Sequence, residues 1–301
     1  FKIKENEKSK YVDRSEGNGE GSSSAGNVFA LQYLAPIDPV YMRDATGKIL
    51  THNESGIPAY DYGDATSGLG IARPYMGQSN PLSDMLVDTR KSLGNKFNGV
   101  GTLQLILPYG FTVTSINSVY LDETRYNDVT NPYFGQYKSQ NGTTTVEQDR
   151  TFNQNYQQRL NWHKQYGKND IEVMAGHEYY RTNDVYVWGQ RHNMFSQGNI
   201  ELGGAVVVDN TGSQESLYNT ESWLARAMYS FDERYYVHLS GMRQGSSAFH
   251  PNHCWGSFYS ASAGWMMSKE KWFKADWVNE LKLKASYGQN GNDFGLNNYY
   301  Y

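Results

Sequence analysis

The feature that most constrains this chain is a regular alternation of apolar and polar side chains over residues 216–290. The segment 223–231 has Trp223, Ala225 and Tyr229 at alternate positions, with Arg226 between them. Segments 235–241 and 281–287 repeat the pattern. Because successive side chains of a strand point to opposite faces, each segment predicts a strand with one apolar and one polar face. Such strands suit a barrel whose outer surface meets lipid and whose interior holds water.

The low mean hydropathy of the chain is compatible with a barrel. Of the 301 residues, 38% are hydrophobic, and the mean hydropathy is −0.72. No apolar run approaches the ~18–20 residues of a spanning helix, whereas a spanning strand needs only ~9–11 residues, every second one apolar. The composition therefore argues against a helical membrane protein. The net charge of −4, without a basic stripe, argues against nucleic acid as a partner.

The same alternation upstream predicts further strands, at 99–107, 111–122, 150–163 and 170–182, with weaker candidates at 1–12 and 27–35. Short connections are predicted near 108–110, 165–169 and 232–233, and a moderate one at 269–278. Long connections are predicted at 36–80, 123–149, 183–215 and 245–254. Alternation of short and long connections is expected when every second one faces the periplasm. It predicts an antiparallel up-and-down sheet with long extracellular loops at 36–80, 123–149 and 183–215.

A set of motifs with regular order and spacing occupies residues 226–292. They are Arg226 with Tyr229; Arg234-Tyr235-Tyr236; Arg243 with Gly245-Ser246-Ser247 and Phe249; Trp255-Gly256-Ser257-Phe258; Ser262-Ala263-Gly264-Trp265; Ser268 with Glu270; Trp272-Phe273; Leu281 to Gly288; and Gly291-Asn292. Through these motifs the chain resembles the barrel of SusC/RagA-type TonB-dependent outer-membrane transporters. It departs from the family pattern at Gln244, Cys254 and Tyr259, near a strand end and a loop.

The resemblance implies both a fold and a function. The implied fold is an all-β, transmembrane, antiparallel up-and-down barrel, of which residues 1–301 form an incomplete part of a plugged barrel of about 22 strands. We expect one partial TonB-dependent receptor barrel domain from a bacterium, without its plug domain. The implied function is TonB-dependent import of a nutrient, an oligosaccharide or a peptide, across the outer membrane. The implied partners are a SusD-like surface lipoprotein, outer-membrane lipid, and the TonB complex acting through the plug region.

Two alternatives stay open from the sequence. One is a TonB-dependent receptor for a siderophore or a cobalamin-type cofactor, which an uptake assay would distinguish from a glycan importer. The other is a soluble β-sandwich that binds glycans at a cell surface. A β-sandwich predicts that a second sheet covers the apolar face formed by Leu281, Leu283 and Ala285.

The candidate ligand contacts are aromatic residues in two of the expected long loops. An aromatic face can stack on a sugar ring while polar neighbours bind its hydroxyl groups. The main candidates are Tyr133, Phe134, Tyr186 and Trp188. Glu172 and Glu178 share one face of the segment 170–182, and we expect them to line the wet interior.

No catalytic, cofactor-binding or metal-binding residues are predicted, and the chain is not expected to be an enzyme. His250, His253 and Cys254 do not have the spacing of a zinc site. The single cysteine, Cys254, excludes an internal disulfide, and its role is left open.

Overall fold

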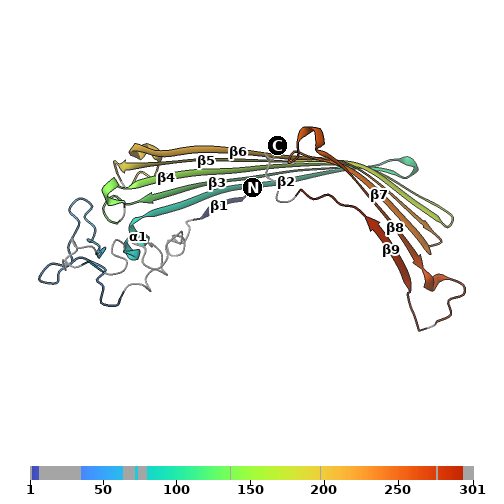
Figure 1. Ribbon diagram of the computed structural model, residues 1–301, viewed down its shortest axis with the longest axis horizontal. Helices are drawn as coiled ribbons and strands as arrows, with labels where there is room; N and C mark the ends of the chain where they lie inside the picture. Colours follow the sequence, from blue (N-terminus) through green and yellow to red (C-terminus); the bar gives the residue numbers. More distant parts are fainter. Residues whose placement is uncertain are drawn as a thin grey trace.

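The chain forms one open, curved antiparallel sheet in which each strand pairs with its neighbour in sequence, from β1 to β9 (Figure 1). The computed structural model describes residues 2–6, 35–63, 72–73, 80–135, 137–196, 198–275 and 277–293. The strands are β1 (Lys2–Asn6), β2 (Thr89–Ile106), β3 (Phe111–Thr130), β4 (Thr143–Tyr166), β5 (Asn169–Met194), β6 (Ala205–Phe231), β7 (Tyr235–Ser246), β8 (Trp255–Met266) and β9 (Lys282–Gly288). The all-β, antiparallel, up-and-down prediction is confirmed.

Short helical elements interrupt the connections. They are α1 (Pro81–Val87), η2 (Pro108–Gly110), η3 (Lys138–Gln140), η4 (Leu202–Gly204), η5 (Pro251–His253) and η6 (Met267–Lys269). The sequence analysis missed α1, although Asn80 accepts a cap hydrogen bond from the Ser83 amide and Pro81 occupies the first turn, both common signals of a helix start. Within the described residues, no helix combines the length and apolar character that crossing a bilayer requires.

The connections between consecutive strands lie at two opposite ends of the sheet. The end that we call the turn end holds 107–110, 167–168, 232–234 and 267–281, and the loop end holds 131–142 and 195–204. The connection 247–254 is on the side of the loop end but lies level with the middle of β6, because β7 and β8 are shorter and Ser246 pairs with Thr220. At the turn end, Gly110 has a φ of +89°, and a Cβ there would lie 2.2 Å from the His163 carbonyl oxygen, so only glycine fits. The expected alternation of short and long connections is wrong at 267–281, which is long but lies at the turn end.

The β-ladder register divides the side chains between two faces. On the apolar face, aliphatic side chains stand out from the sheet: Leu160 is 44% exposed, Leu239 52% and Leu283 60%. This exposure contradicts the β-sandwich alternative, which required a second sheet over Leu283. The described residues form a single sheet, so no second layer of described residues covers its apolar face.

Two rows of aromatic side chains frame the apolar face. Near the turn end, Phe111 lies opposite Trp162, and Tyr235 lies opposite both Phe231 and Trp265. Nearer the loop end, the aromatic side chains on this face are Tyr156, Tyr179, Trp223 and Trp255. On β6 the rows are eight residues apart, which is about 26 Å of strand at about 3.3 Å per residue. A strand tilt of about 40° reduces this to about 20 Å of thickness, comparable with the ~25 Å apolar band of barrels.

Four strands run further toward the loop end than the sequence pattern indicated. β3 continues to Thr130, β4 starts at Thr143, β5 continues to Met194 and β6 starts at Ala205. The expected loops 123–149 and 183–215 are therefore wrong in extent, and the true connections are 131–142 and 195–204. The added parts of β3 and β4 have polar side chains on both faces, and those of β5 and β6 contain the apolar runs Val185–Trp188 and Val206–Val208. In neither case does an alternation of apolar and polar side chains reveal the pairing.

The first expected loop, 36–80, is irregular where the structure describes it. Residues 35–63 contain three isolated bridges, Tyr41 with Tyr60, Arg43 with Ile49, and Thr51 with Pro58. Residues 64–71 and 74–79, and residues 27–34 of the weaker strand candidate at 27–35, lie outside the described residues. The other weak candidate, 1–12, is confirmed in part as β1, which pairs with β2.

Polar contacts hold the turn end between β6 and β9. Glu270 accepts hydrogen bonds from the Tyr235 hydroxyl (2.6 Å), the Trp265 indole (3.0 Å) and Arg234 Nη1 (3.1 Å). The Tyr235 hydroxyl is the main cause that lowers the pKa of Glu270. Arg234, Tyr235 and Trp265, all from the recognised motifs, thus fasten the connection 267–281 to the adjacent ends of β7 and β8.

Candidate transport surface

The polar face carries hydrogen bonds between side chains of adjacent strands. Gln157 Nε2 on β4 donates to Glu178 Oε1 on β5 at 2.8 Å. Further toward the loop end, Thr182 Oγ1 on β5 donates to Asn153 Oδ1 on β4 at 2.6 Å. Cross-strand pairs of this kind add to the stability of the backbone ladder and leave further polar atoms for water or a solute.

Charged pairs lie on the same polar face. Arg226 Nη2 on β6 donates to Glu172 Oε1 on β5 at 3.0 Å, and Lys96 on β2 pairs with Asp122 on β3. Glu172 and Glu178 therefore share this face, as expected, and each has a partner on a neighbouring strand. With the apolar face opposite, the sheet separates a surface that suits lipid from one that suits water.

A buried aromatic cluster lies among the loops near the loop end. Its buried members are Ala59, Tyr60, Tyr62 and Phe134, with Tyr41, Met42, Ile57, Val87 and Tyr133 packed around them. The Tyr62 hydroxyl donates to Ser83 Oγ at 2.8 Å, which links the cluster to α1. Burial is the main cause that raises the pKa of the Tyr60 phenol. We call this group the loop cluster.

Two of the four ligand candidates belong to the loop cluster. Phe134 is only 6% exposed and lies edge-on to Tyr60, with ring centroids 5.4 Å apart. Tyr133 is half-buried, and its ring centroid lies 5.1 Å from that of His52. Asn131 Oδ1 accepts hydrogen bonds from the backbone amides of both residues and fixes this turn. Phe134 therefore packs the loops together, whereas the half-buried Tyr133 has part of its ring available.

The other two candidates lie on a strand and not in a loop. Tyr186 and Trp188 belong to β5, where they lie opposite Asp149 and Glu147 of β4. Both are half-buried and lie on the same face as Glu178. Gly212 on β6 pairs with Trp188, and a Cβ at Gly212 would lie 2.7 Å from the Trp188 indole nitrogen, so the indole lies close over that glycine. The structure thus separates the four candidates into two groups.

The sequence analysis did not anticipate the contribution of residues 41–62 to the loop cluster. Tyr60 and Tyr62 are far from Phe134 in sequence, and no local periodicity connects them. The only available signal was the density of tyrosine within a proline-containing loop. His250 and His253 lie on the exposed η5 turn, where the His250 ring nitrogen accepts from the Asn252 amide at 3.2 Å, so that side chain caps the turn.

Comparisons with known proteins agree with this architecture. No family model matches the chain. It is 28% identical over 221 residues to TonB-dependent receptor SusC of Bacteroides thetaiotaomicron, a match that covers 70% of this chain and 21% of SusC. It is 24% identical over 221 residues to TonB-dependent receptor P26 of Formosa agariphila, covering 71% of this chain and 22% of that protein. The chain therefore spans about a fifth of the length of these relatives.

Solved structures show the same fold. The structure of the RagAB peptide transporter superposes with a TM-score of 0.64 at 18% identity, covering 81% of this chain and 26% of the matched chain. The RagAB peptide importer in its open-open state superposes with a TM-score of 0.62 at 19% identity. The motifs of residues 226–292, the sequence matches and the shared fold agree: the chain is similar in sequence and in fold to TonB-dependent receptors of the SusC/RagA type.

Proposed function

We propose that this protein imports an oligosaccharide across the outer membrane in a TonB-dependent manner, with the described strands as part of its barrel wall. The observation that carries the proposal is the two-faced sheet. Its apolar face lies between two aromatic rows, and its polar face carries hydrogen-bonded and charged pairs. A bilayer requires this division, because every backbone polar group must be paired while only apolar side chains meet the lipid.

The loop end faces the outside of the cell and the turn end faces the periplasm in this proposal. The support is that the loop end holds the long strand extensions and the loop cluster, whereas tight turns occupy most of the opposite end. In bacterial barrels the extracellular connections are the longer ones. Residues 36–80, 131–142 and 195–204 are then extracellular, and they belong to one barrel domain with the strands.

The cargo class rests on the aromatic residues of the polar face. Tyr186 and Trp188 lie among hydrogen-bonding side chains near the loop end, a combination that suits a sugar ring and its hydroxyl groups. A peptide is the second candidate, favoured by the shared fold with a structure described as a peptide transporter. Tyr133 is a further proposed contact, and Phe134 acts by supporting it.

The partners follow from the proposed role. A SusD-like surface lipoprotein would cover the loop end, and the TonB complex would act through a plug region of the kind the family implies. The protein would carry its cargo unchanged, because its task is to provide a wet passage through lipid. Binding at the loop end and energised release toward the turn end are then separate steps.

A comparison of nutrient uptake by cells with and without the gene tests the proposal. Cells with and without the full-length protein would be compared for uptake of labelled oligosaccharides, peptides and iron chelates, with and without TonB. We expect oligosaccharide uptake that requires both the protein and TonB. Uptake of iron chelates alone would favour the siderophore-receptor alternative, and recovery of the protein as a soluble periplasmic species would contradict the transporter.

A further inference from the structure

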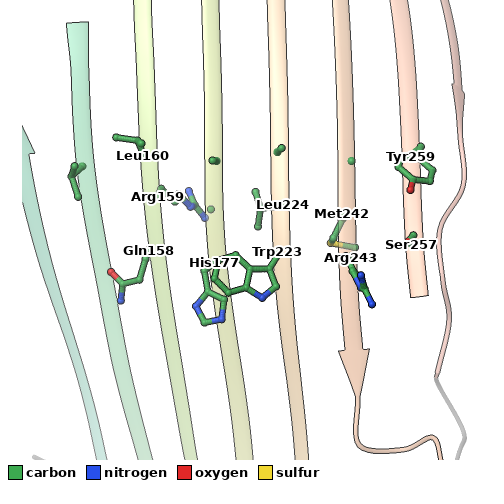
Figure 2. Close-up of a pocket in the computed structure, with 15 residues that line it drawn as sticks. Gln158, Arg159, Leu160, His177, Trp223, Leu224, Met242, Arg243, Ser257 and Tyr259 are labelled. Atoms are coloured by element: carbon green, nitrogen blue, oxygen red, sulfur yellow. The ribbon is translucent and has the colours of Figure 1, made fainter. Parts of the chain in front are cut away.

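A hollow of about 640 Å³ lies on the apolar face, away from the proposed cargo surface (Figure 2). The β-ladder register places one row of residues across its middle, in the order Val113, Leu160, Ala175, Ala225, Gly241 and Tyr259. The three smallest of these, Ala175, Ala225 and Gly241, lie side by side on β5, β6 and β7. The hollow exists because these three side chains are short while those on either side are long.

A row of polar character borders the hollow on the side of the loop end. In register across the same strands lie Ser115, Gln158, His177, Trp223, Arg243 and Ser257. Figure 2 shows His177, Trp223 and Arg243 along one edge of the hollow. One face of the sheet thus changes from apolar to polar within a single step of two residues. That change occurs level with Trp223, in the aromatic row near the loop end.

Two side chains of this row, His177 and Arg243, differ in their partners. His177 Nε2 lies 3.0 Å from Glu221 Oε1, and the His177 ring lies against Trp223 with centroids 4.3 Å apart. The exposed Arg243 contacts the Trp255 ring, with its guanidinium carbon 5.6 Å from the centroid, and it forms no ion pair with any other described residue. The carboxylate of Glu221 is therefore hydrogen-bonded to His177, whereas the guanidinium of Arg243 is available to a ligand.

We propose that this hollow binds a membrane lipid with an anionic, phosphate-bearing head group. The phosphate contacts Arg243, the side chain of Ser257 on the next strand offers a hydrogen bond, and an acyl chain lies over Ala175, Ala225 and Gly241. A lipid is the occupant that matches all three features: an available cation at the membrane interface, an apolar floor on the hydrocarbon side, and a location on the lipid-facing surface. The site is separate from cargo transport and does not depend on the cargo.

The floor of the hollow can be filled without straining the sheet. A Cβ on Gly241 would lie 3.5 Å from the nearest Tyr259 ring atom, which is ordinary van der Waals contact. A leucine at this position would occupy the hollow and still face lipid, as Leu239 does two residues away. Gly241→Leu therefore removes the space while leaving Arg243 in place.

Native mass spectrometry of the full-length transporter in detergent tests the site. Dioleoylphosphatidylglycerol and dioleoylphosphatidylcholine would be added separately to wild type, Arg243→Gln, Gly241→Leu and Arg226→Gln. Arg226 is the matched control, because it lies on the opposite face, outside the hollow, and donates to Glu172 at 3.0 Å. Heat-modifiable migration on gels would confirm that each variant is folded.

We expect the wild type and Arg226→Gln to retain phosphatidylglycerol in preference to phosphatidylcholine. Arg243→Gln should weaken phosphatidylglycerol binding about fivefold, the factor that one basic residue near an anionic surface supplies. Gly241→Leu should weaken binding of both lipids, and inorganic phosphate should not compete. Equal binding by wild type and Arg243→Gln would overturn the proposal. So would a dimer mass that Gly241→Leu converts to monomer, because the occupant would then be a second copy of the chain.

Discussion

The assignment of the apolar face to lipid can be tested at Leu239. This residue lies on β7 opposite Ala227 and Ala261, so its side chain stands above two small neighbours and is 52% exposed. It is midway between Tyr235 in one aromatic row and Arg243 at the other border. Replacing Leu239 by arginine places a cation near the centre of the proposed hydrocarbon layer, about 13 Å along the strand from either border.

The expected cost follows from that depth. A cation on the lipid-facing surface of a barrel costs about 2–4 kcal/mol at the bilayer midplane. At 1.4 kcal/mol for each factor of ten, this lowers the ratio of folded to unfolded protein by roughly 30- to 700-fold. Asn161→Arg provides the control, since Asn161 lies on the polar face of β4 opposite Thr112 and Met174. A substitution on a water-facing surface should change stability by no more than about 0.5 kcal/mol.

The assay is guanidinium-induced unfolding of the full-length protein from phosphatidylcholine vesicles, followed by tryptophan fluorescence. Unchanged transition slopes would allow the midpoints of the variants to be compared as differences in unfolding free energy. We expect a clear loss for Leu239→Arg and almost none for Asn161→Arg. If the two variants were equally stable, or if Asn161→Arg were the weaker, the division of the sheet into lipid and water faces would be wrong.

Three further predictions concern the turn end, the loop cluster and the cargo surface. Hydrogen bonds lower the pKa of Glu270. Its contribution to the stability of the connection 267–281 is therefore present above the ordinary carboxyl pKa range and is lost as pH falls through the lowered pKa. Proteolysis of the connection 267–281 should therefore accelerate in acid for wild type and for the exposed control Glu280→Gln. In Glu270→Gln it should be fast already at neutral pH, and matching profiles for the two variants would contradict this role. Phe134→Ala should destabilise the loop cluster by about 3–5 kcal/mol, because it removes a buried aromatic ring. The rate of amide hydrogen exchange in residues 41–62 should therefore rise. An unchanged exchange rate would mean that the packing of these loops does not depend on Phe134. Trp188→Ala should weaken oligosaccharide binding measured by calorimetry and leave the unfolding midpoint of the protein near the wild-type value. Unaltered affinity would show that Trp188 does not belong to the proposed contact surface.

The sequence predicted the loops between β3 and β4 and between β5 and β6, but not their boundaries. Alternation revealed 111–122 and 150–163 because these segments carry one apolar face. It did not reveal 123–130 or 143–149, where both faces are polar although the β3 to β4 ladder continues without a break. Hydrogen-bonded pairing keeps these strands extended beyond the apolar band, and a residue pattern cannot report pairing that lacks a buried side.

The ligand candidates show a related limit. Choosing Tyr133 and Phe134 together assumed that neighbouring loop aromatics share a role, yet one ring is half-buried and the other is buried against Tyr60. Which side of a loop is covered depends on a segment some seventy residues earlier in the chain. Local sequence contains no information about that contact.

The strands, their two faces and the resemblance to SusC/RagA-type transporters were readable from the sequence, because strand periodicity is local and the motifs of residues 226–292 keep their spacing. The hollow on the apolar face was not, because Ala175, Ala225 and Gly241 become neighbours only through the register of three strands. A shift of one residue in that register would send each side chain to the other face. The tertiary structure alone therefore decided that three small residues and one available arginine meet on the apolar face of the sheet.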